Sequence, residues 1–411
     1  MIVNNQQLID SFVKLKHYCE AELYKGWDPY DGLNSKVFQT LPFLKKSAVC
    51  RLAVIQFFKR CPINFRRIAL VPKEYNAKGI ALFLQGYCNL VKVVSKNSEY
   101  ESALGKKEEL FTRVNELAEL LISLQSKGNY HGACWGYNFD WQARKLFLFP
   151  KGTPTVVATT FCVSALLDAY EVMEQEKCTN YEHEKWKDIA LSSAEFVLHD
   201  LHRHPCRRGF LFSYSPLQGN DTVYNASLLG SKLLSLCYHY TSKQEYFDAA
   251  HQSVMACCDA QQTDGSWVYG MLPVQSWIDS FHTGYNLEAL NVYEEMTGDT
   301  TFHTYIEKGF EFYIKNFFEE DGCPKYYHNK KFPIDIHCSG EFFVTLSRLH
   351  KSKKYTVVAE KVLNWTISNM QGEKGYFYYQ KKKWLTTRIP YMRWSNAFMF
   401  CALTEYARKK F

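Results

Sequence analysis

Two segments in the second half of the chain place a carboxylate beside an imidazole at the start of an apolar stretch. Asp279 and His282 are three positions apart, and Asp335 and His337 are two positions apart. An imidazole titrates near neutral pH and a neighbouring carboxylate can orient it, so such pairs suit general acid/base catalysis. These four side chains are the first catalytic candidates. In the alternative interpretation, each Asp only caps a helix and each His makes structural hydrogen bonds.

Two further residues are candidates for proton transfer. Asp140 lies between Phe139 and Trp141, and apolar neighbours raise the pKa of a carboxyl group towards that of a useful acid. Tyr327 follows Lys325 in an aromatic segment and would accept a proton if nearby cations lowered its pKa.

Side chains that suit a sugar or an acidic group are spread along the chain. An Arg offers a bidentate fork for a carboxylate or phosphate, and a Trp offers a flat apolar face for a sugar ring. On these grounds the binding candidates are Arg393, Trp394, Tyr391, Lys325, Trp277, Trp267, Trp141, Asp28 and Asp31. Arg393 would anchor an anion, and Trp267, Trp277 and Trp394 would stack. The alternatives are an Arg paired with a core acid, aromatic rings that fill the core, and an ordinary Asp-Pro turn at Asp28.

A weak repeat shows which elements would position these residues. Polar or aromatic clusters precede six apolar stretches, centred on positions 76, 159, 225, 282, 337 and 393. Between them, amphipathic segments end in glycine-containing turns such as 262–267 and 371–376. A hairpin of two helices cannot bury its apolar face alone, so such units must stack or close on one another.

Six hairpins that close on themselves make an all-α (α/α)6 barrel, a toroid of about six helical hairpins. We expect one domain over residues 1–411, in which residues 1–60 form an N-terminal helical segment that completes the ring. The inner helices would all begin at one end, where helix N-termini favour carboxylates or phosphates.

Composition narrows the function classes. The 49 basic and 42 acidic side chains give a formal charge of +7, and the basic residues are scattered, whereas a nucleic-acid binder usually shows a concentrated basic face. No apolar run resembles a secretory signal or a membrane span. We therefore expect a cytoplasmic protein with no nucleic-acid partner, no stable membrane insertion and its 14 Cys as thiols.

The turn Gln261–Trp267 resembles the Gln-x-x-x-Gly-x-Trp element of squalene-cyclase and protein-prenyltransferase toroids. The layout of residues 60–411 also resembles the six-hairpin glycosidases, which include unsaturated glucuronyl hydrolases and sugar 2-epimerases. The absence of an Asp-x-Asp-Asp segment counts against the cyclase branch. A further similarity, to uncharacterised proteins encoded among bacterial surface-polysaccharide genes, is carried by 27–33, 333–337 and 390–394. This further similarity favours glycan chemistry without naming a reaction.

Metal and nucleotide chemistry are not predicted. One cluster suited to metal contains His199, His202, His204 and Cys206, but structural zinc sites pair two such clusters. A prenyltransferase-like zinc site at Asp335, His337 and Cys338 is the other alternative. The sequence has no phosphate loop, dinucleotide fingerprint or nucleophile elbow. We expect no metal and no cofactor.

These observations favour an enzyme that acts by general acid/base catalysis on a saccharide or uronate of a bacterial surface polysaccharide. Its partner would be a saccharide or a lipid-linked glycan; the oligomeric state is open. Hydrolysis, elimination and epimerisation remain alternatives: carboxyl groups roughly 5–10 Å apart would suit hydrolysis, and a Tyr facing a His would favour the other two. The rivals are an enzyme for isoprenoid or polyprenyl substrates, with a cavity of few charges, and a non-catalytic helical scaffold.

Overall fold

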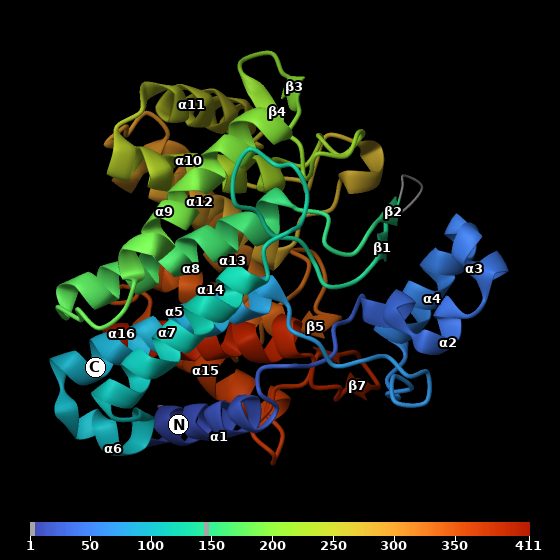
Figure 1. Cartoon of the computed structure of the whole chain (residues 1–411). Coiled ribbons are helices and arrows are strands. Elements are labelled where there is room, and N and C mark those ends of the chain that lie inside the picture. The colour runs from blue at the N-terminus through green and yellow to red at the C-terminus, as the bar shows by residue number, and fades with distance from the viewer. Residues whose placement is uncertain (1–4, 144–147) are drawn as a thin grey trace.

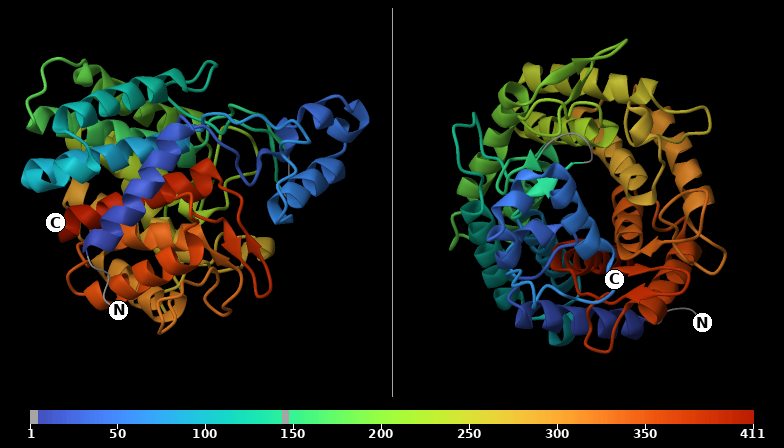
Figure 2. Two further views of the ribbon diagram at one scale, coloured as in Figure 1. Left: turned by 90° about the horizontal axis from the view of Figure 1, so that it is seen from below. Right: turned by 90° about the vertical axis from the view of Figure 1, so that its right-hand side faces the viewer.

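A computed structural model describes residues 5–143 and 148–411, which form a closed ring of helices. Each of six inner helices contacts two others, and the ring closes between the last and the first (Figure 2, right). In ring order the inner helices are α5 (Ala77–Lys96), α8 (Val156–Gln175), α10 (Tyr224–Thr241), α12 (Ser280–Thr297), α14 (Ile336–Arg348) and α16 (Phe398–Lys410).

Each inner helix packs against an outer helix, so the ring consists of six hairpins. The N-terminal helix α1 (Asn5–Ala21) is the outer partner of α16. The other outer helices are α7 (Lys107–Ser123), α9 (His183–Glu195), α11 (Gln244–Asp259), α13 (His303–Phe317) and α15 (Thr356–Met370). The all-α (α/α)6 fold predicted from the repeat is confirmed, whereas the assignment of residues 1–411 to a single domain stays a prediction.

The inner helices begin at the same end of the ring, which we call the mouth (Figures 1 and 2). Four of them follow a side-chain N-cap of the expected type: the Asn76 side chain caps α5, Thr155 caps α8, Asp279 caps α12 and Asp335 caps α14. One expected boundary is wrong. The Thr159-Thr160 cluster lies inside α8, because Thr155 provides the cap four residues earlier.

The glycine turns join each outer helix to the next hairpin. Gly265 has φ +90°, and a Cβ there would lie 2.4 Å from the carbonyl oxygen of Lys308 on the next outer helix. Gln261 donates from Nε2 to the carbonyl oxygens of Gly265 (3.0 Å) and Tyr305 (2.9 Å). The Gln-x-x-x-Gly turn therefore fixes the spacing between neighbouring outer helices, which is a structural role.

A lobe formed by residues 31–71 stands at the mouth, in front of the ring when the ring is viewed along its axis (Figure 2, right). It has a small core of Leu33, Phe38 and Ile55. Thus α1 completes the ring, but the helices that follow it do not. The lobe contains η1 (Asp31–Asn34), α2 (Lys36–Gln39), α3 (Pro42–Lys46) and α4 (Ala48–Arg60).

Within the described residues, the segments outside the hairpins and the lobe contain only short strands and short helical turns. Antiparallel pairs join β1 (Trp141–Gln142) to β2 (Leu148–Phe149) and β3 (Arg203–Pro205) to β4 (Phe210–Phe212), and a three-stranded sheet has the order β5 (Ile334–Asp335), β6 (Gln380–Lys381), β7 (Thr386–Thr387). The remaining helical turns are η2 (Ser98–Tyr100), α6 (Glu101–Leu104), η3 (Phe196–Asp200), η4 (Pro273–Gln275) and η5 (Met392–Ala397). Among the described residues, α8 is long and apolar enough to cross a membrane, but 78% of that stretch is buried in the ring, as in a core helix.

Candidate active site at the mouth of the ring

The first Asp/His pair forms a dyad at the start of α12. Asp279 is buried, and its Oδ1 accepts the backbone N–H of His282 at 3.0 Å. Its Oδ2 lies 2.7 Å from His282 Nδ1 and accepts the indole N–H of Trp277 at 2.9 Å. Because a carboxylate only accepts, Nδ1 carries a proton, so the lone pair of the neutral imidazole is on Nε2. The His282 side chain remains 22% exposed, so the dyad can act as a base on a bound molecule.

The second pair, at the start of α14, is arranged differently. Asp335 accepts the backbone N–H of His337 (3.1 Å) and the indole N–H of Trp394 (2.9 Å) on Oδ1, and the Gln380 amide (3.1 Å) on Oδ2. Burial raises the pKa of Asp335 to about 6, although these hydrogen bonds oppose the shift. The imidazole of His337 does not turn back to this carboxylate.

The His337 ring faces the ring interior instead. Its Nε2 lies 2.5 Å from the hydroxyl of Tyr285, and its Nδ1 donates to the carbonyl oxygen of Trp394 at 3.3 Å. The imidazole packs on Phe398, with ring centroids 3.6 Å apart. Burial lowers the pKa of His337 well below its usual value, and the charges of Lys78 and Arg393 add to the effect. His337 is therefore a neutral imidazole whose Nε2 accepts a hydrogen bond from the Tyr285 hydroxyl.

Lys78 extends this contact to a third inner helix. Its Nζ lies 3.4 Å from the Tyr285 hydroxyl and 3.8 Å from the centroid of the Phe161 ring. Burial, and then the positive charge of Arg393, lower the pKa of Lys78 well below its usual value. The polar chain Lys78–Tyr285–His337 thus crosses from α5 through α12 to α14.

Aromatic rings surround the dyad. Trp277 stacks on Tyr269 with centroids 4.4 Å apart and an interplanar angle of 15°, and both rings are partly exposed. On the other side, Phe281 lies between His282 (4.2 Å) and His337 (4.7 Å). Trp277 therefore offers the flat, partly open face that a sugar ring would stack on.

Trp394 and Trp141 extend this group of aromatic rings, since both contact Tyr30. The Trp394 ring lies 4.6 Å from His337 and 5.7 Å from Tyr30, and its indole is tied to Asp335. Trp141 lies farther out, against Phe149 at 4.9 Å. Its face is partly exposed, whereas Trp394 is only 8% exposed.

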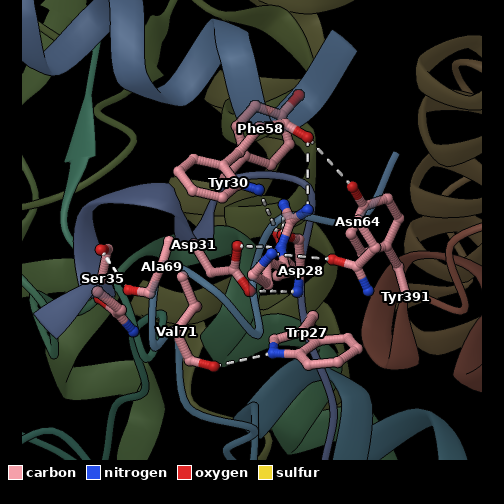
Figure 3. Close-up of polar contacts among 12 residues, drawn as sticks. Trp27, Asp28, Tyr30, Asp31, Ser35, Phe58, Asn64, Ala69, Val71 and Tyr391 are labelled. Atoms are coloured by element: carbon pink, nitrogen blue, oxygen red, sulfur yellow. Dashed lines mark hydrogen bonds and ion pairs between the residues drawn. The ribbon is translucent and has the colours of Figure 1, made fainter. Parts of the chain in front are cut away.

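A buried ionic network joins the lobe and the residues just before it to η5, the turn that precedes the last inner helix. Figure 3 shows the part of this network around Asp28 and Asp31. Arg393 donates to both carboxylate oxygens of Asp28, from Nε at 2.6 Å and from Nη2 at 2.9 Å. Arg66 donates to Asp31 Oδ1 at 2.7 Å and to the Asp28 carbonyl at 2.8 Å. The charge of Arg393 is therefore already balanced within the protein, which corrects the expectation that this guanidinium is free to anchor a substrate anion.

Four other candidates lie outside the group around the dyad. Trp267 is 2% exposed and donates its indole N–H to the carbonyl of Cys257, so it fills the core and is not a stacking platform. Tyr391 is fully buried, with its ring 4.7 Å from the Arg66 guanidinium. Asp140 accepts the backbone N–H of Lys151 at 2.7 Å, and Lys325 donates to the carbonyl of His328 at 3.1 Å; both side chains hold loops together.

Tyr327 is the nearest of the remaining candidates. Its backbone forms a bridge with Asp279, and the Lys330 ammonium lies 4.3 Å from the centroid of its ring. The segment that carries Tyr326 and Tyr327 thus borders the dyad, and Ser280 donates its N–H to the Tyr326 carbonyl at 2.9 Å.

The clusters weighed as metal sites have other partners. His202 Nε2 contacts the carbonyl of Pro216 at 2.9 Å, His204 contacts Asp221 at 3.3 Å, and His199 contacts Glu195 at 3.2 Å. Within residues 5–143 and 148–411, no group of three or more His, Cys, Asp or Glu side chains is arranged to hold a metal ion.

Sequence reasoning missed the residues in the interior of the ring. Lys78 and Tyr285 were not named, nor was the cluster in which Glu288 binds Lys232 at 2.8 Å and also Arg348. Their signal was present, since each is a charged or hydroxyl-bearing side chain in an otherwise apolar inner helix. A titratable residue on the buried face of a helix needs a partner from another helix, and the sequence does not identify that partner.

Comparisons with known proteins agree with this architecture. No family model and no curated protein sequence matches the chain. Among solved structures, the cellobiose 2-epimerase from Bacillus thermoamylovorans superposes with a TM-score of 0.58 and 13% identity, over 82% of this chain and 90% of that one. A GH76 α-mannanase from Bacteroides thetaiotaomicron (TM-score 0.54, 13% identity, 82% and 86%) and an unsaturated glucuronyl hydrolase specific for heparin (0.51, 13%, 80% and 86%) are similar to the same extent. The chain therefore has the six-hairpin (α/α)6 fold that these sugar-processing enzymes share.

Proposed function

We propose that this protein is a carbohydrate-active enzyme that moves a proton at a carbon next to the carbonyl of a reducing sugar, as in epimerisation or isomerisation. The observation that carries the proposal is the state of the four catalytic candidates. Both oxygens of Asp279 and both of Asp335 accept hydrogen bonds from the protein. The imidazole of His282, in contrast, is partly exposed, and in its neutral form its Nδ1–H donates to Asp279 while Nε2 offers a lone pair.

Such an arrangement favours proton transfer over glycoside hydrolysis. A glycosidase needs one carboxylic acid that donates to the leaving group and a second carboxylate that acts as base or nucleophile. Here both carboxylates orient other groups. His282 would remove the proton from the carbon, and its Asp279 partner would stabilise the imidazolium that forms.

The electron pair left on the carbon would move into the carbonyl group to give an enolate, which then takes up a proton on carbon as the electron pair returns. The chain Lys78–Tyr285–His337 is the candidate for that second proton transfer, because a tyrosine faces a histidine in it at 2.5 Å. Trp277 and Tyr269 would hold the sugar ring against the dyad. Elimination from a uronate is less favoured, because Arg393 is already paired with Asp28.

The two rivals fit less well. An isoprenoid site should have few charges, whereas Lys232, Glu288, Glu341 and Arg348 line a small cavity between the inner helices, which has room for about one water molecule. A scaffold would not need a polarised Asp–His dyad with an open imidazole.

We place the enzyme in bacterial surface-polysaccharide metabolism and in the cytoplasm as part of this proposal. Its support is that three segments, 27–33, 333–337 and 390–394, resemble uncharacterised proteins encoded among bacterial surface-polysaccharide genes. The three segments also contact one another in the folded chain. Asp28 pairs with Arg393, and Trp394 donates to Asp335.

Proton exchange in heavy water tests the proposed reaction. The wild-type protein is incubated with a panel of reducing mono- and disaccharides in D2O, and the hydrogen at the carbon next to the carbonyl is followed by NMR. Incorporation of deuterium by wild type and not by His282→Gln supports the proposal. Release of new reducing ends without exchange would show that the enzyme is a hydrolase instead.

A further inference from the structure

The lobe of residues 31–71 exposes an unusual amount of apolar surface. Of the thirteen large hydrophobic side chains exposed in the described chain, seven lie in this lobe. Soluble monomers rarely leave such side chains gathered in one region unless the region contacts something. The seven are Val37 (47%), Phe43 (68%), Val49 (77%), Phe57 (51%), Ile63 (62%), Ile68 (76%) and Leu70 (55%).

The charge of the lobe has one sign. Residues 31–71 contain eight Lys and Arg and a single acid, Asp31, which is buried in its ion pair with Arg66. No Asp or Glu is therefore exposed anywhere on the lobe. Among the basic residues, the following five are exposed: Lys36, Lys45, Lys46, Arg60 and Arg67.

The hairpin between β6 and β7 continues this surface. Trp384 at its tip is 87% exposed, Leu385 is 45% exposed, and the tip follows three consecutive lysines, 381–383. Lys382 donates from Nζ to the carbonyl oxygen of Arg60 at 3.2 Å, so the hairpin is attached to the end of α4. The lobe and the hairpin tip together form what we call the basic apolar rim.

We propose that the basic apolar rim docks on the surface of a membrane that contains anionic lipids. Exposed Phe, Ile, Val and Trp side chains interleaved with Lys and Arg are the composition of protein segments that lie in the lipid interface. Clustered basic residues are attracted to anionic headgroups within a Debye length of the surface.

Charge and side-chain type favour a lipid surface over two other partners for the rim, a second copy of the chain and nucleic acid. The same rim on a second copy of the chain would present like charge, which opposes a symmetric dimer through this face. Nucleic acid would meet mostly aliphatic side chains, which do not stack on bases as flat aromatic rings do. An anionic lipid surface matches both the charge and the apolar side chains.

Docking in this orientation has a consequence for the substrate. The lobe lies in front of the mouth (Figure 2, right), so the rim would hold the mouth close to the lipid headgroups. Resting on the proposed function, we infer that the sugar is carried by a lipid, and that the rim brings the dyad to it.

Vesicle flotation with the full-length protein tests the docking. Vesicles of phosphatidylcholine alone are compared with vesicles that also contain phosphatidylglycerol. We expect roughly tenfold more protein to float with the anionic vesicles at low salt, and we expect high salt to reduce that binding. Trp384→Ser, Val49→Ser and the double variant Lys45→Glu/Lys46→Glu should each lower it several-fold. No binding to anionic vesicles by the wild type would overturn the proposal.

Matched variants at the other end of the ring serve as controls. Val357 is 67% exposed at the start of α15, and Lys353 and Lys354 are exposed in the loop before it, where α14 has already ended. Val357→Ser and Lys353→Glu/Lys354→Glu should float like wild type. If they lose binding as much as the rim variants do, the attraction is general and the rim is not a docking surface.

Further measurements test whether the rim binds a second copy of the chain or nucleic acid instead, and keep the test of docking apart from the test of the proposed function. Sedimentation without vesicles would assign the rim to a second copy if it showed a dimer that Trp384→Ser dissolves, and tight binding of single-stranded DNA that Lys45→Glu/Lys46→Glu abolishes would assign it to nucleic acid. Either result would overturn membrane docking. Deuterium exchange on soluble sugars is measured separately, so a wild-type protein that exchanges deuterium but does not float with anionic vesicles rejects only the docking.

Discussion

Asp279 and Asp335 occupy the same place at the beginning of neighbouring inner helices, yet their histidines have different environments. Each Asp caps its helix and each accepts an indole N–H, from Trp277 or from Trp394. His282 folds back onto its Asp and stays 22% exposed. His337 turns away from its Asp, contacts Tyr285 and is 1% exposed.

One residue of spacing accounts for the difference. His282 is the third residue after its cap, so both its backbone N–H and its ring reach the capping carboxylate. His337 is the second residue, so its N–H reaches the carboxylate while its ring projects towards α12 and α16. The first pair can therefore touch a substrate, whereas His337 of the second pair lies in the interior of the ring and can act on a proton transfer only through Tyr285.

The largest effect should come from replacing the exposed imidazole. His282→Gln removes the only group of the two pairs with both a free lone pair and exposure, and we expect kcat/KM to fall by about 10²–10⁴-fold. The melting temperature should change little, because the ring is partly exposed. Deuterium exchange from D2O into the sugar measures the loss.

His337→Gln is the matched comparison for activity. Its effect on exchange should be clearly smaller than that of His282→Gln at equal amounts of folded protein. Equal losses in both variants would contradict the division of roles between the pairs.

Stability should respond in the opposite order. His337→Ala leaves a cavity beside Phe398 and removes the partner of the buried Tyr285 hydroxyl. We expect a loss of about 3–4 kcal/mol in the free energy of unfolding, as for other large core side chains. Urea unfolding followed by circular dichroism checks it, with His282→Ala as the control that should lose about 1 kcal/mol or less.

The sequence predicts the ring better than it predicts the site. Six apolar stretches are enough to place the inner helices, and four of these helices also have a side-chain cap, such as Asn76 or Asp279, which acts within one turn. The same local logic identified both Asp/His pairs. It did not separate them, because the direction of the His337 ring depends on Tyr285, which belongs to another helix.

Long-range partners account for the other errors. Arg393 looked like a free anion anchor because its partner, Asp28, is 365 residues away and is reached only when the ring closes. Trp267 looked like a sugar platform, but the turn that carries it is a spacer between outer helices. Lys78 was overlooked because an inner helix does not reveal which of its residues face the mouth.

The capping carboxylate of the buried pair should titrate. Asp335 has a pKa of about 6 in the folded chain against 3.8 normally, so the folded state holds this proton more tightly. Stability from this group is therefore present at low pH and is lost as the pH rises from about 4 to 6. Asp335→Asn lacks this titration. Relative to wild type, the variant should gain about 2–3 kcal/mol in unfolding free energy between about pH 4.5 and pH 7.

Urea unfolding at both pH values measures this gain. A difference between variant and wild type that stays constant with pH would mean that burial does not govern the Asp335 carboxyl group.

The smallest effect should separate the two tryptophans that donate to the capping carboxylates. Trp277 is partly exposed and stacks on Tyr269, so Trp277→Phe should keep a flat ring but lose one hydrogen bond to Asp279. We expect KM for the sugar to rise several-fold, worth about 1 kcal/mol, with little change in melting temperature. Trp394→Phe removes the equivalent bond to a fully buried carboxylate, so it should lower the melting temperature and leave KM nearly unchanged. If both variants changed only the melting temperature, the open face of Trp277 would not be part of the sugar site, and the exposed dyad would have to bind its substrate from another side.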